Sequence, residues 1–119
     1  RKDLDGQVMR NQTGVATWLI DQGKRLLIPD ELTFNSLFTG WDVIVKDDDV
    51  VNIDEGQTLS SGAALFRGNG VATWLVTNGQ KRPIDSEDIF NKYHFAWGKI
   101  QYVPQIVLDS MKTGPSVGP

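Results

Sequence analysis

The sequence Gly14-Val15-Ala16-Thr17-Trp18-Leu19 occurs a second time, without a change, as Gly70-Val71-Ala72-Thr73-Trp74-Leu75. With this spacing of 56 held fixed, twelve of the 28 positions from 14 to 41 are identical in the two copies. The identities beyond the hexapeptide place Gly23, Ile28, Glu31, Phe34, Asn35 and Trp41 on Gly79, Ile84, Glu87, Phe90, Asn91 and Trp97. The chain is therefore predicted to contain two copies of one unit.

The register between the copies changes after Trp97. Ile53-Asp54-Glu55-Gly56 corresponds to Met111-Lys112-Thr113-Gly114 at a spacing of 58, which implies two extra residues in a loop around Gln101–Gln105. Repeats of roughly 50 residues are typical of stacked or pseudo-symmetric modules, in which neighbouring units close a shared core. We expect one domain over residues 1–119, made of repeat 1 at 6–60 and repeat 2 at 61–115.

Length, charge and composition bound the class of protein. A chain of 119 residues suits one domain with its own core, and the absence of cysteine excludes disulfides and thiolate metal sites. A formal net charge of −3 argues against a nucleic-acid-binding protein, whose surface is usually strongly basic. No apolar run approaches the roughly 18 residues that span a bilayer. The chain begins with Arg1 and has no signal-like segment, so we expect a piece of a longer or processed protein.

Repeat 1 is predicted to form an antiparallel meander of three strands followed by a short helix. The strands, rich in β-branched and aromatic residues between turn signals, span 7–10, 15–21 and 24–28. Pro29 ends the meander, and Asp30 is a good N-cap for a helix from Glu31 to about Phe38. An apolar stripe at helical spacing predicts the core of the unit: Phe34, Leu37, Phe38 and Trp41. The pattern over 42–56 leaves strand and helical turn open.

Repeat 2 is predicted to follow the same plan. Its strands span 63–67, 71–77 and 81–84, and Ser86 is the predicted cap of a helix from 87 to about 95. The apolar stripe of this helix is Phe90, Tyr93, His94 and Trp97. The fold class is therefore α+β, with two similar units, each a small antiparallel β-meander plus a short helix, related by approximate two-fold or stacking symmetry. We expect residues 1–6 to be a frayed lead-in and 113–119 a disordered end or a linker.

The repeat resembles a known sequence pattern. Trp18-Leu-Ile-Asp-Gln-Gly-Lys-Arg25, Ile28-Pro-Asp30, Phe34-Asn-Ser-Leu37, Trp41-Asp-Val-Ile44 and Ile53-Asp-Glu-Gly56 are similar to a repeat of about 55 residues in bacterial secreted and surface-attached proteins. Repeat 2 fits through Trp74 to Ile84 and Phe90 to Trp97, but has Asp85 where the pattern prefers proline. The resemblance implies an extracellular accessory module, secreted or at the cell surface, and implies no ligand.

Two of the four tryptophans are candidates for ligand contact. Trp18 and Trp74 are interpreted as twin platforms on which a sugar ring stacks, because an indole face packs well against a pyranose. The plainer alternative is that both fill the buried face of the central strand. Trp41 and Trp97 lie on the helical stripes, so we expect them in the core.

Hairpin turns are predicted at Asp21-Gln22-Gly23 and Asn78-Gly79, and a basic pair follows each of them. Lys24-Arg25 and Lys81-Arg82 are candidates for holding an anionic polymer such as a phosphate- or uronate-bearing cell-wall glycan. The alternative is a solvated flank of the hairpin. Two copies make even weak sites useful, since a polymer that engages both gains avidity.

Other chemistry has weaker support. The acidic run Asp47-Asp48-Asp49 lacks the EF-hand spacing, so we favour a solvated loop over a calcium site. His94 is the single histidine and is expected to be a partly buried core residue. With no cysteine and no nucleophile motif, nucleophilic catalysis has little support. Paired carboxylates for glycoside hydrolysis are not readable from sequence. We expect no enzyme activity, no metal and no cofactor.

The sequence thus favours a non-catalytic extracellular binding module that recognises a cell-wall or host-surface glycan. The alternative is a structural or protein-interaction repeat module of a larger secreted protein, in which every tryptophan is core. The expected partner is a polysaccharide or a protein, with no nucleic acid and no membrane span. Solvent exposure of Trp18 and Trp74 distinguishes the two functions.

Overall fold

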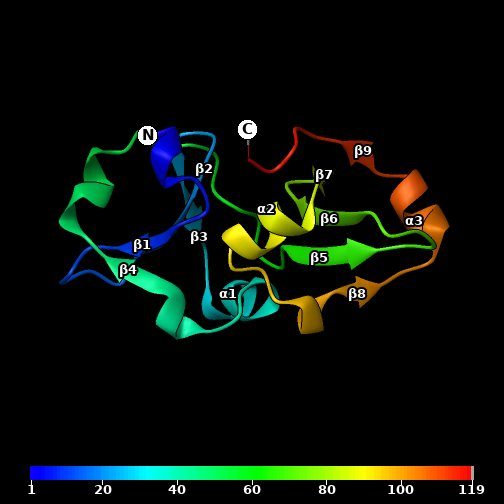
Figure 1. Ribbon diagram of the computed structural model, residues 1–119, viewed down its shortest axis with the longest axis horizontal. Coiled ribbons are helices and arrows are strands. Elements are labelled where there is room, and N and C mark those ends of the chain that lie inside the picture. The colour runs from blue at the N-terminus through cyan, green and yellow to red at the C-terminus, as the bar shows by residue number, and fades with distance from the viewer. Residues whose placement is uncertain (119) are drawn as a thin grey trace.

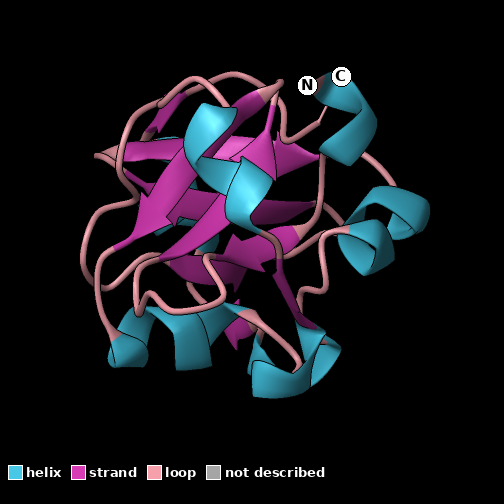
Figure 2. Ribbon diagram, turned by 90° about the vertical axis from the view of Figure 1, so that its left-hand side faces the viewer, coloured by secondary structure: helices cyan, strands magenta, loops and turns pink. Residues whose placement is uncertain are grey.

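The computed structural model describes residues 1–118 and has an α+β fold with two mixed β-sheets and three short α-helices. The first sheet lies at the left of Figure 1 and the second at the right, with α1 and α2 between them. Figure 2, viewed from the side of the first sheet, shows strands in the middle and most helical turns at the periphery. The predicted α+β class is confirmed.

The elements follow one another in nearly the same order in the two halves. The first half contains β1 (Val8–Arg10), β2 (Thr17–Asp21), β3 (Lys24–Ile28), α1 (Glu31–Leu37) and β4 (Ile44–Lys46). The second half contains β5 (Ala64–Arg67), β6 (Thr73–Thr77), β7 (Gln80–Ile84), α2 (Glu87–Lys92), β8 (Gln101–Tyr102), α3 (Gln105–Asp109) and β9 (Lys112–Thr113). Short 3-10 helices span Lys2–Leu4, Trp41–Val43, Asp48–Asn52 and Trp97–Lys99.

Each sheet is built on an antiparallel meander with a parallel strand at its edge. The first sheet has the order β3-β2-β1-β4, and the second has the order β8-β5-β6-β7-β9. β4 runs parallel to β1, as β8 does to β5 and β9 to β7. The segment 42–56, left open by its sequence, therefore contains both a strand and a helical turn. The loop expected around Gln101–Gln105 is wrong, because β8 and the start of α3 lie there.

The two predicted hairpin turns are confirmed by their backbone angles. Gln22 and Gly23 have φ of 51° and 76°, and Asn78 and Gly79 have φ of 55° and 74°. Two consecutive residues with positive φ are what a type I′ turn requires, and its twist matches that of the flanking strands. Asn78 and both glycines adopt this conformation at low cost, whereas Gln22 is of a residue type that seldom does.

The two helices begin where their caps predict. The Asp30 carboxylate accepts hydrogen bonds from Thr33 N at 2.8 Å and from Thr33 Oγ1 at 2.7 Å. In the second half, Ser86 Oγ accepts from Ile89 N at 3.1 Å. The expected end of the second helix near Phe95 is wrong, because α2 stops at Lys92.

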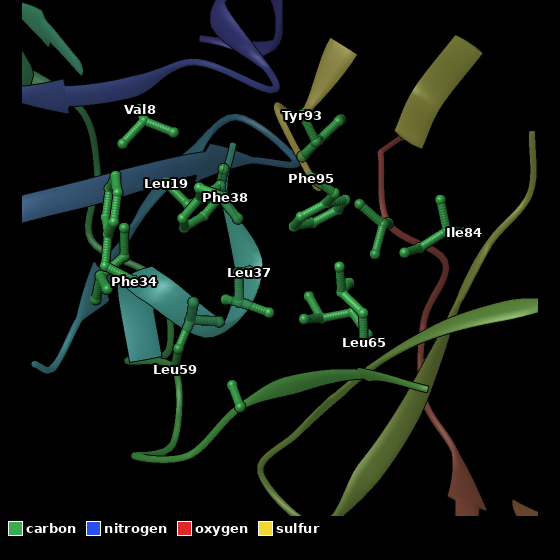
Figure 3. Close-up of a cluster of buried hydrophobic side chains, with 14 of the residues drawn as sticks. Val8, Leu19, Phe34, Leu37, Phe38, Leu59, Leu65, Ile84, Tyr93 and Phe95 are labelled. Carbon is green, nitrogen blue, oxygen red and sulfur yellow. The ribbon is translucent and has the colours of Figure 1, made fainter. Parts of the chain in front are cut away.

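One apolar core joins the two halves (Figure 3). Phe38 and Phe95 are buried at its centre, and their rings stack with centroids 5.7 Å apart. Around them lie side chains from both sheets and both helices: Val8, Leu19, Phe34, Leu37, Leu59, Leu65, Ile84 and Tyr93. The first half has a second, smaller apolar cluster as well, formed by Met9, Ile20, Val50 and Ile53.

The helical stripes predict part of this core correctly. Phe34, Leu37, Phe38, Phe90 and Tyr93 are buried. The core assignment of Trp41 and Trp97 is wrong, because they are 41% and 42% exposed. Each helix ends before its tryptophan, so the helical period no longer sets the direction of the side chain. His94 is half-buried, as expected, and has a φ of 61° in the turn after α2.

Both chain ends pack against the β2–β3 hairpin. At the start, Asp5 is buried and its Oδ1 accepts a hydrogen bond from Gly23 N at 2.9 Å. At the other end, Val117 is buried and Gly118 N donates to Asp21 Oδ1 at 2.9 Å. The predictions of a frayed start and a disordered end are therefore wrong through residue 118, and Pro119 lies outside the described residues. Within residues 1–118, no helix has the length and apolar character that crossing a membrane requires.

A buried polar cluster links the halves next to the apolar core. Arg82 Nη2 donates to Asp21 Oδ2 at 2.5 Å, and Tyr93 Oη donates to Asp21 Oδ1 at 2.8 Å. Arg82 also donates from Nε to Pro115 O at 2.9 Å and from Nη2 to Ser116 O at 3.0 Å. The charges of this buried pair are therefore compensated by each other and by backbone groups.

Burial and the adjacent Asp21 carboxylate raise the pKa of Tyr93 well above its ordinary value of 10.0. In the unfolded chain Tyr93 loses its proton near pH 10, whereas the folded protein retains it, so rising pH favours unfolding. We expect the free energy of unfolding to fall above pH 10 by up to about 1.4 kcal/mol per pH unit from this group. Urea unfolding between pH 8 and 11 measures the slope.

The Tyr93→Phe variant is the control for this pH dependence. It removes the titrating hydroxyl and keeps the ring in the core, so the slope attributed to Tyr93 disappears while the lysine and arginine contributions remain. At neutral pH the variant loses one hydrogen bond, worth about 1 kcal/mol. Equal slopes in the two proteins would contradict the assignment.

Candidate functional site

Each half of the molecule carries an open hollow between the meander and the start of its helix. Hollow 1, of about 580 Å³, is lined by Arg10, Val15, Ala16, Thr17, Leu27, Ile28, Pro29, Asp30, Glu31, Phe34 and Trp41. Hollow 2, of about 700 Å³, is lined by Arg67, Val71, Ala72, Thr73, Trp74, Pro83, Ile84, Asp85, Ser86, Glu87, Phe90 and Trp97. Nearly every position that lines one hollow corresponds to a position that lines the other.

A half-exposed tryptophan stacked on a buried phenylalanine forms one wall of each hollow. The indole of Trp41 lies on the ring of Phe34 with centroids 3.9 Å apart and an interplanar angle of 16°. Trp97 lies on Phe90 with centroids 4.0 Å apart and an interplanar angle of 31°. The indole nitrogens are fixed as well, since Nε1 donates to Asn35 Oδ1 at 3.0 Å in one half and to Asn91 Oδ1 at 2.8 Å in the other. Both indoles are thus held in defined orientations.

An arginine on the first strand of each meander lines the same hollow. The guanidinium of Arg10 donates from Nε and Nη2 to Thr17 Oγ1 at 3.1 and 2.7 Å. Arg67 donates from the same two nitrogens to Thr73 Oγ1, also at 3.1 and 2.7 Å. Strand pairing places each threonine directly opposite its arginine. The threonine hydroxyl therefore fixes the direction of the guanidinium in both hollows.

The rims of the hollows combine an acid and an exposed apolar residue. Glu31 and Glu87 are exposed at the first position of their helices, where the helix dipole favours a negative charge. Val15 and Val71 are both 88% exposed. Asp30 is already engaged: hydrogen bonds from Ser61 and Thr33 hold the pKa of its carboxyl below the usual value.

The tryptophans favoured by the sequence, Trp18 and Trp74, are half-buried and each lies against a cation. The guanidinium carbon of Arg25 lies 4.2 Å from the ring centroid of Trp18, and Lys81 Nζ lies 4.8 Å from that of Trp74. Both cations also bond to the backbone, Arg25 Nε to Ile53 O at 2.8 Å and Lys81 Nζ to Leu108 O at 2.6 Å. Only Trp74 lines a hollow. The cation over each indole competes with a sugar ring for that face.

The two basic pairs are not equivalent in the structure. Strand pairing matches Arg25 with Lys81, so Lys24 corresponds to Gln80 and Leu26 to Arg82. Arg82 is 8% exposed and bonded to Asp21, and is therefore no longer a candidate for contact with a polymer. Lys24 is exposed, and its role in binding stays a prediction.

The acidic run Asp47–Asp49 is accounted for by local hydrogen bonds. Asp47 Oδ1 accepts from Asp49 N at 2.9 Å and caps the 3-10 helix, and Asp49 Oδ1 accepts from Asn52 Nδ2 at 3.1 Å. Asp48 Oδ1 accepts from Gln12 N at 3.0 Å. Among residues 1–118 there is no group of three or more histidine, aspartate or glutamate side chains placed to hold a metal ion.

Sequence reasoning missed Arg10 and Arg67 because the turn after the first strand differs in length. At the fixed spacing of 56, Arg10 corresponds to Phe66, whereas the strand pairing matches Arg10 with Arg67. A signal for the indoles was present, since Asn35 and Trp41 recur as Asn91 and Trp97. An asparagine and a tryptophan that recur together at the same spacing favour an indole held at the surface by a hydrogen bond over an indole in the core.

Comparisons with protein-family models, with curated proteins and with solved structures give no match for this chain.

Proposed function

We propose that this chain is a non-catalytic binding module, secreted or at the cell surface, with two pseudo-symmetric repeats that each hold a glycan site in the hollow beside the helix. The observation that carries this proposal is the pair of hollows built from corresponding residues. Each has a fixed, half-exposed indole, an oriented arginine and a carboxylate at its rim.

A short antiparallel bridge connects the two repeats at their junction. Thr39 N donates to His94 O at 2.9 Å, and Ala96 N donates to Leu37 O at 2.9 Å. Phe38 and Phe95 pair as an isolated antiparallel bridge between these two hydrogen bonds. At the spacing of 56, Phe38 corresponds to His94 and not to Phe95, so this bridge ties the two repeats together without pairing equivalent residues.

Matching hydrogen bonds in the connections support the repeat boundaries and the two-residue change in register. Gly56 N donates to Arg25 O at 2.9 Å, and Gly114 N donates to Lys81 O at 2.9 Å. Both glycines sit close to side chains of the strand beside them, so that an added Cβ on Gly56 would lie 2.6 Å from Leu26 Cδ2. The two donors, Gly56 and Gly114, are 58 residues apart, whereas the two acceptors, Arg25 and Lys81, are 56 residues apart. The same backbone contact thus recurs with the change in register that the sequence shows.

The chemistry of the hollows favours a sugar ring as ligand. An indole offers a rigid apolar face to the C–H groups of a pyranose at little conformational cost, and surrounding polar groups bond its hydroxyls. Arg10 and Glu31 supply a donor and an acceptor in hollow 1, as Arg67 and Glu87 do in hollow 2. Two such sites on one rigid domain bind a polymer with avidity, because the second contact is intramolecular.

The test is retention of the purified protein on cell walls and a panel of polysaccharides. Simultaneous Trp41→Ala and Trp97→Ala changes remove both indoles, and we expect binding to each site to weaken about tenfold, the usual value of an aromatic contact. The matched control is Tyr102→Ala, which removes an aromatic ring that is 72% exposed outside both hollows. Circular dichroism and thermal unfolding verify the fold of each variant.

Equal binding by the tryptophan variant and the wild type would refute the two sites. Loss of binding in the Tyr102→Ala control as well would show that the effect is not specific to the hollows.

The exposed valines favour a second function, docking of a protein partner. Val15 and Val71 at the rims and Leu32 beside hollow 1 are 88%, 88% and 81% exposed, and large apolar groups in repeated positions are a feature of interaction sites. Absence of retention on every polysaccharide tested would favour this alternative. Charged substitutions, Val15→Asp and Val71→Asp, would then be expected to abolish partner binding.

A further inference from the structure

The guanidinium groups of Arg10 and Arg67 have no anionic partner among residues 1–118. Salt bridges in this part of the chain join Arg1 to Asp3, Arg25 to Glu55, and Arg82 to Asp21. Arg10 and Arg67 bond instead to a threonine hydroxyl, which is neutral. Both are half-buried, and both line a hollow. The fold thus positions the same unpaired cation twice.

This arrangement leaves part of each guanidinium available to bind a ligand in the hollow. A guanidinium has five N–H donors, and the threonine contact uses one on Nε and one on Nη2. A half-buried cation is partly removed from water, so its interaction with an anion is stronger than that of a fully solvated lysine. Its planar fork fits the two oxygens of a carboxylate, and the charge-assisted hydrogen bonds that result are roughly twice as strong as neutral ones.

We infer that Arg10 and Arg67 bind the carboxylate of an acidic sugar, so that the two hollows recognise uronate residues of a polysaccharide. This inference rests on the proposed glycan function and names its ligand class. The indoles of Trp41 and Trp97 support the sugar ring, and Glu31 and Glu87 accept hydrogen bonds from its hydroxyls.

The charges around the hollows favour a singly charged carboxylate over a phosphate dianion. Hollow 1 is lined by the carboxylates of Asp30 and Glu31 and hollow 2 by those of Asp85 and Glu87, so a dianion meets stronger repulsion than a monoanion does. The net charge of −3 also opposes binding of a densely charged polyanion. A uronate carries one charge per ring and several hydroxyl donors, which suits an arginine and a glutamate together.

The decisive measurement is isothermal titration of the whole protein with two probes, an oligomer of galacturonic acid and its methyl ester. The ester keeps the ring and hydroxyls and loses the negative charge. We expect the free acid to bind about tenfold to a hundredfold more tightly, the value of a hydrogen bond to a charged group. Equal affinity for the two probes would overturn the inference while leaving glycan binding intact, whereas no binding of either probe or of any polysaccharide would refute the proposed function itself.

Substitution of both arginines supplies the protein side of the test. In the Arg10→Gln, Arg67→Gln variant we expect the preference for the free acid to disappear, with affinity for the ester changed less than threefold. The matched control is Arg1→Gln, Lys112→Gln, which removes the same charge from exposed positions outside the hollows and is expected to retain the preference. If the control variant loses the preference for the free acid as fully as the Arg10→Gln, Arg67→Gln variant does, the preference comes from long-range electrostatics. The assignment to Arg10 and Arg67 then fails.

A second variant guards against misfolding of the first. Arg10→Lys, Arg67→Lys keeps both positive charges and removes the planar fork, and we expect a preference for the free acid between those of the wild type and the glutamine variant. Full wild-type preference in the lysine variant would show that charge alone suffices and would overturn the proposed carboxylate contact.

Discussion

Replacement of Asp21 by alanine is expected to lower the free energy of unfolding by about 3–5 kcal/mol. The carboxylate is buried and accepts hydrogen bonds from Arg82 Nη2, Tyr93 Oη and Gly118 N. Its removal leaves the buried Arg82 cation without its counter-charge, and this uncompensated charge causes most of the cost. Urea unfolding at pH 7, monitored by tryptophan fluorescence, measures the change.

The corresponding positions in the opposite half of the chain suggest a control for this prediction. Thr77 and Leu26 occupy the positions that correspond to Asp21 and Arg82. The double variant Asp21→Thr, Arg82→Leu removes both charges together, and we expect it to be less destabilised than Asp21→Ala alone, since replacing a buried ion pair by apolar groups is often close to neutral. A double variant less stable than the single one would contradict this account and show that the pair itself holds the C-terminal segment.

Replacement of Phe38 by alanine is the second change with a large expected effect, about 3–5 kcal/mol. Its ring is fully buried where the two halves of the chain meet, tilted against Phe34 with centroids 4.9 Å apart and stacked on Phe95 with centroids 5.7 Å apart. Truncation removes apolar contacts from both halves and leaves a cavity that the surrounding strands cannot close. The same urea unfolding experiment measures the loss.

Two further variants make the result for Phe38 specific. The side chain of Val15 is 88% exposed, so we expect the Val15→Ala variant to change the free energy of unfolding by no more than about 0.5 kcal/mol. A double-mutant cycle with Phe95→Ala is expected to give a coupling of about 0.5–1.5 kcal/mol, because the two rings touch. Independent unfolding of the two halves, seen as two transitions, would contradict the shared core.

For the candidate site, the sequence predicted Trp41 and Trp97 to be core residues, and the structure shows both of them exposed. Trp18 and Trp74 lie on regular strands and are half-buried, with a cation 4.2 and 4.8 Å from the ring centroid, whereas Trp41 and Trp97 follow the helices and are 41% and 42% exposed. Trp74 and Trp97 both line hollow 2, and the guanidinium carbon of Arg67 lies 5.9 Å from the ring centroid of Trp97. Helical periodicity is meaningful only while the helix continues, and both helices end before the indoles.

The sequence by itself determined what depends on residues a few positions apart. Alternation and β-branched residues specified the meanders, Asn78-Gly79 and Gln22-Gly23 their turns, and Asp30 and Ser86 the starts of the helices. Each of these preferences depends on local backbone conformation and local hydrogen bonding, and each signal occurs in both halves of the sequence.

Only the tertiary structure decided what depends on distant contacts. Asp21 meets Arg82, Tyr93 and Gly118 across separations of 61, 72 and 97 residues, and these contacts bury a predicted surface arginine and order a predicted disordered end. Arg10 and Arg67 line the hollows because strand pairing sets each opposite its threonine, in the same hollow as an indole from a later part of the chain. Burial and charge compensation are properties of the assembled core, so no local pattern encodes them.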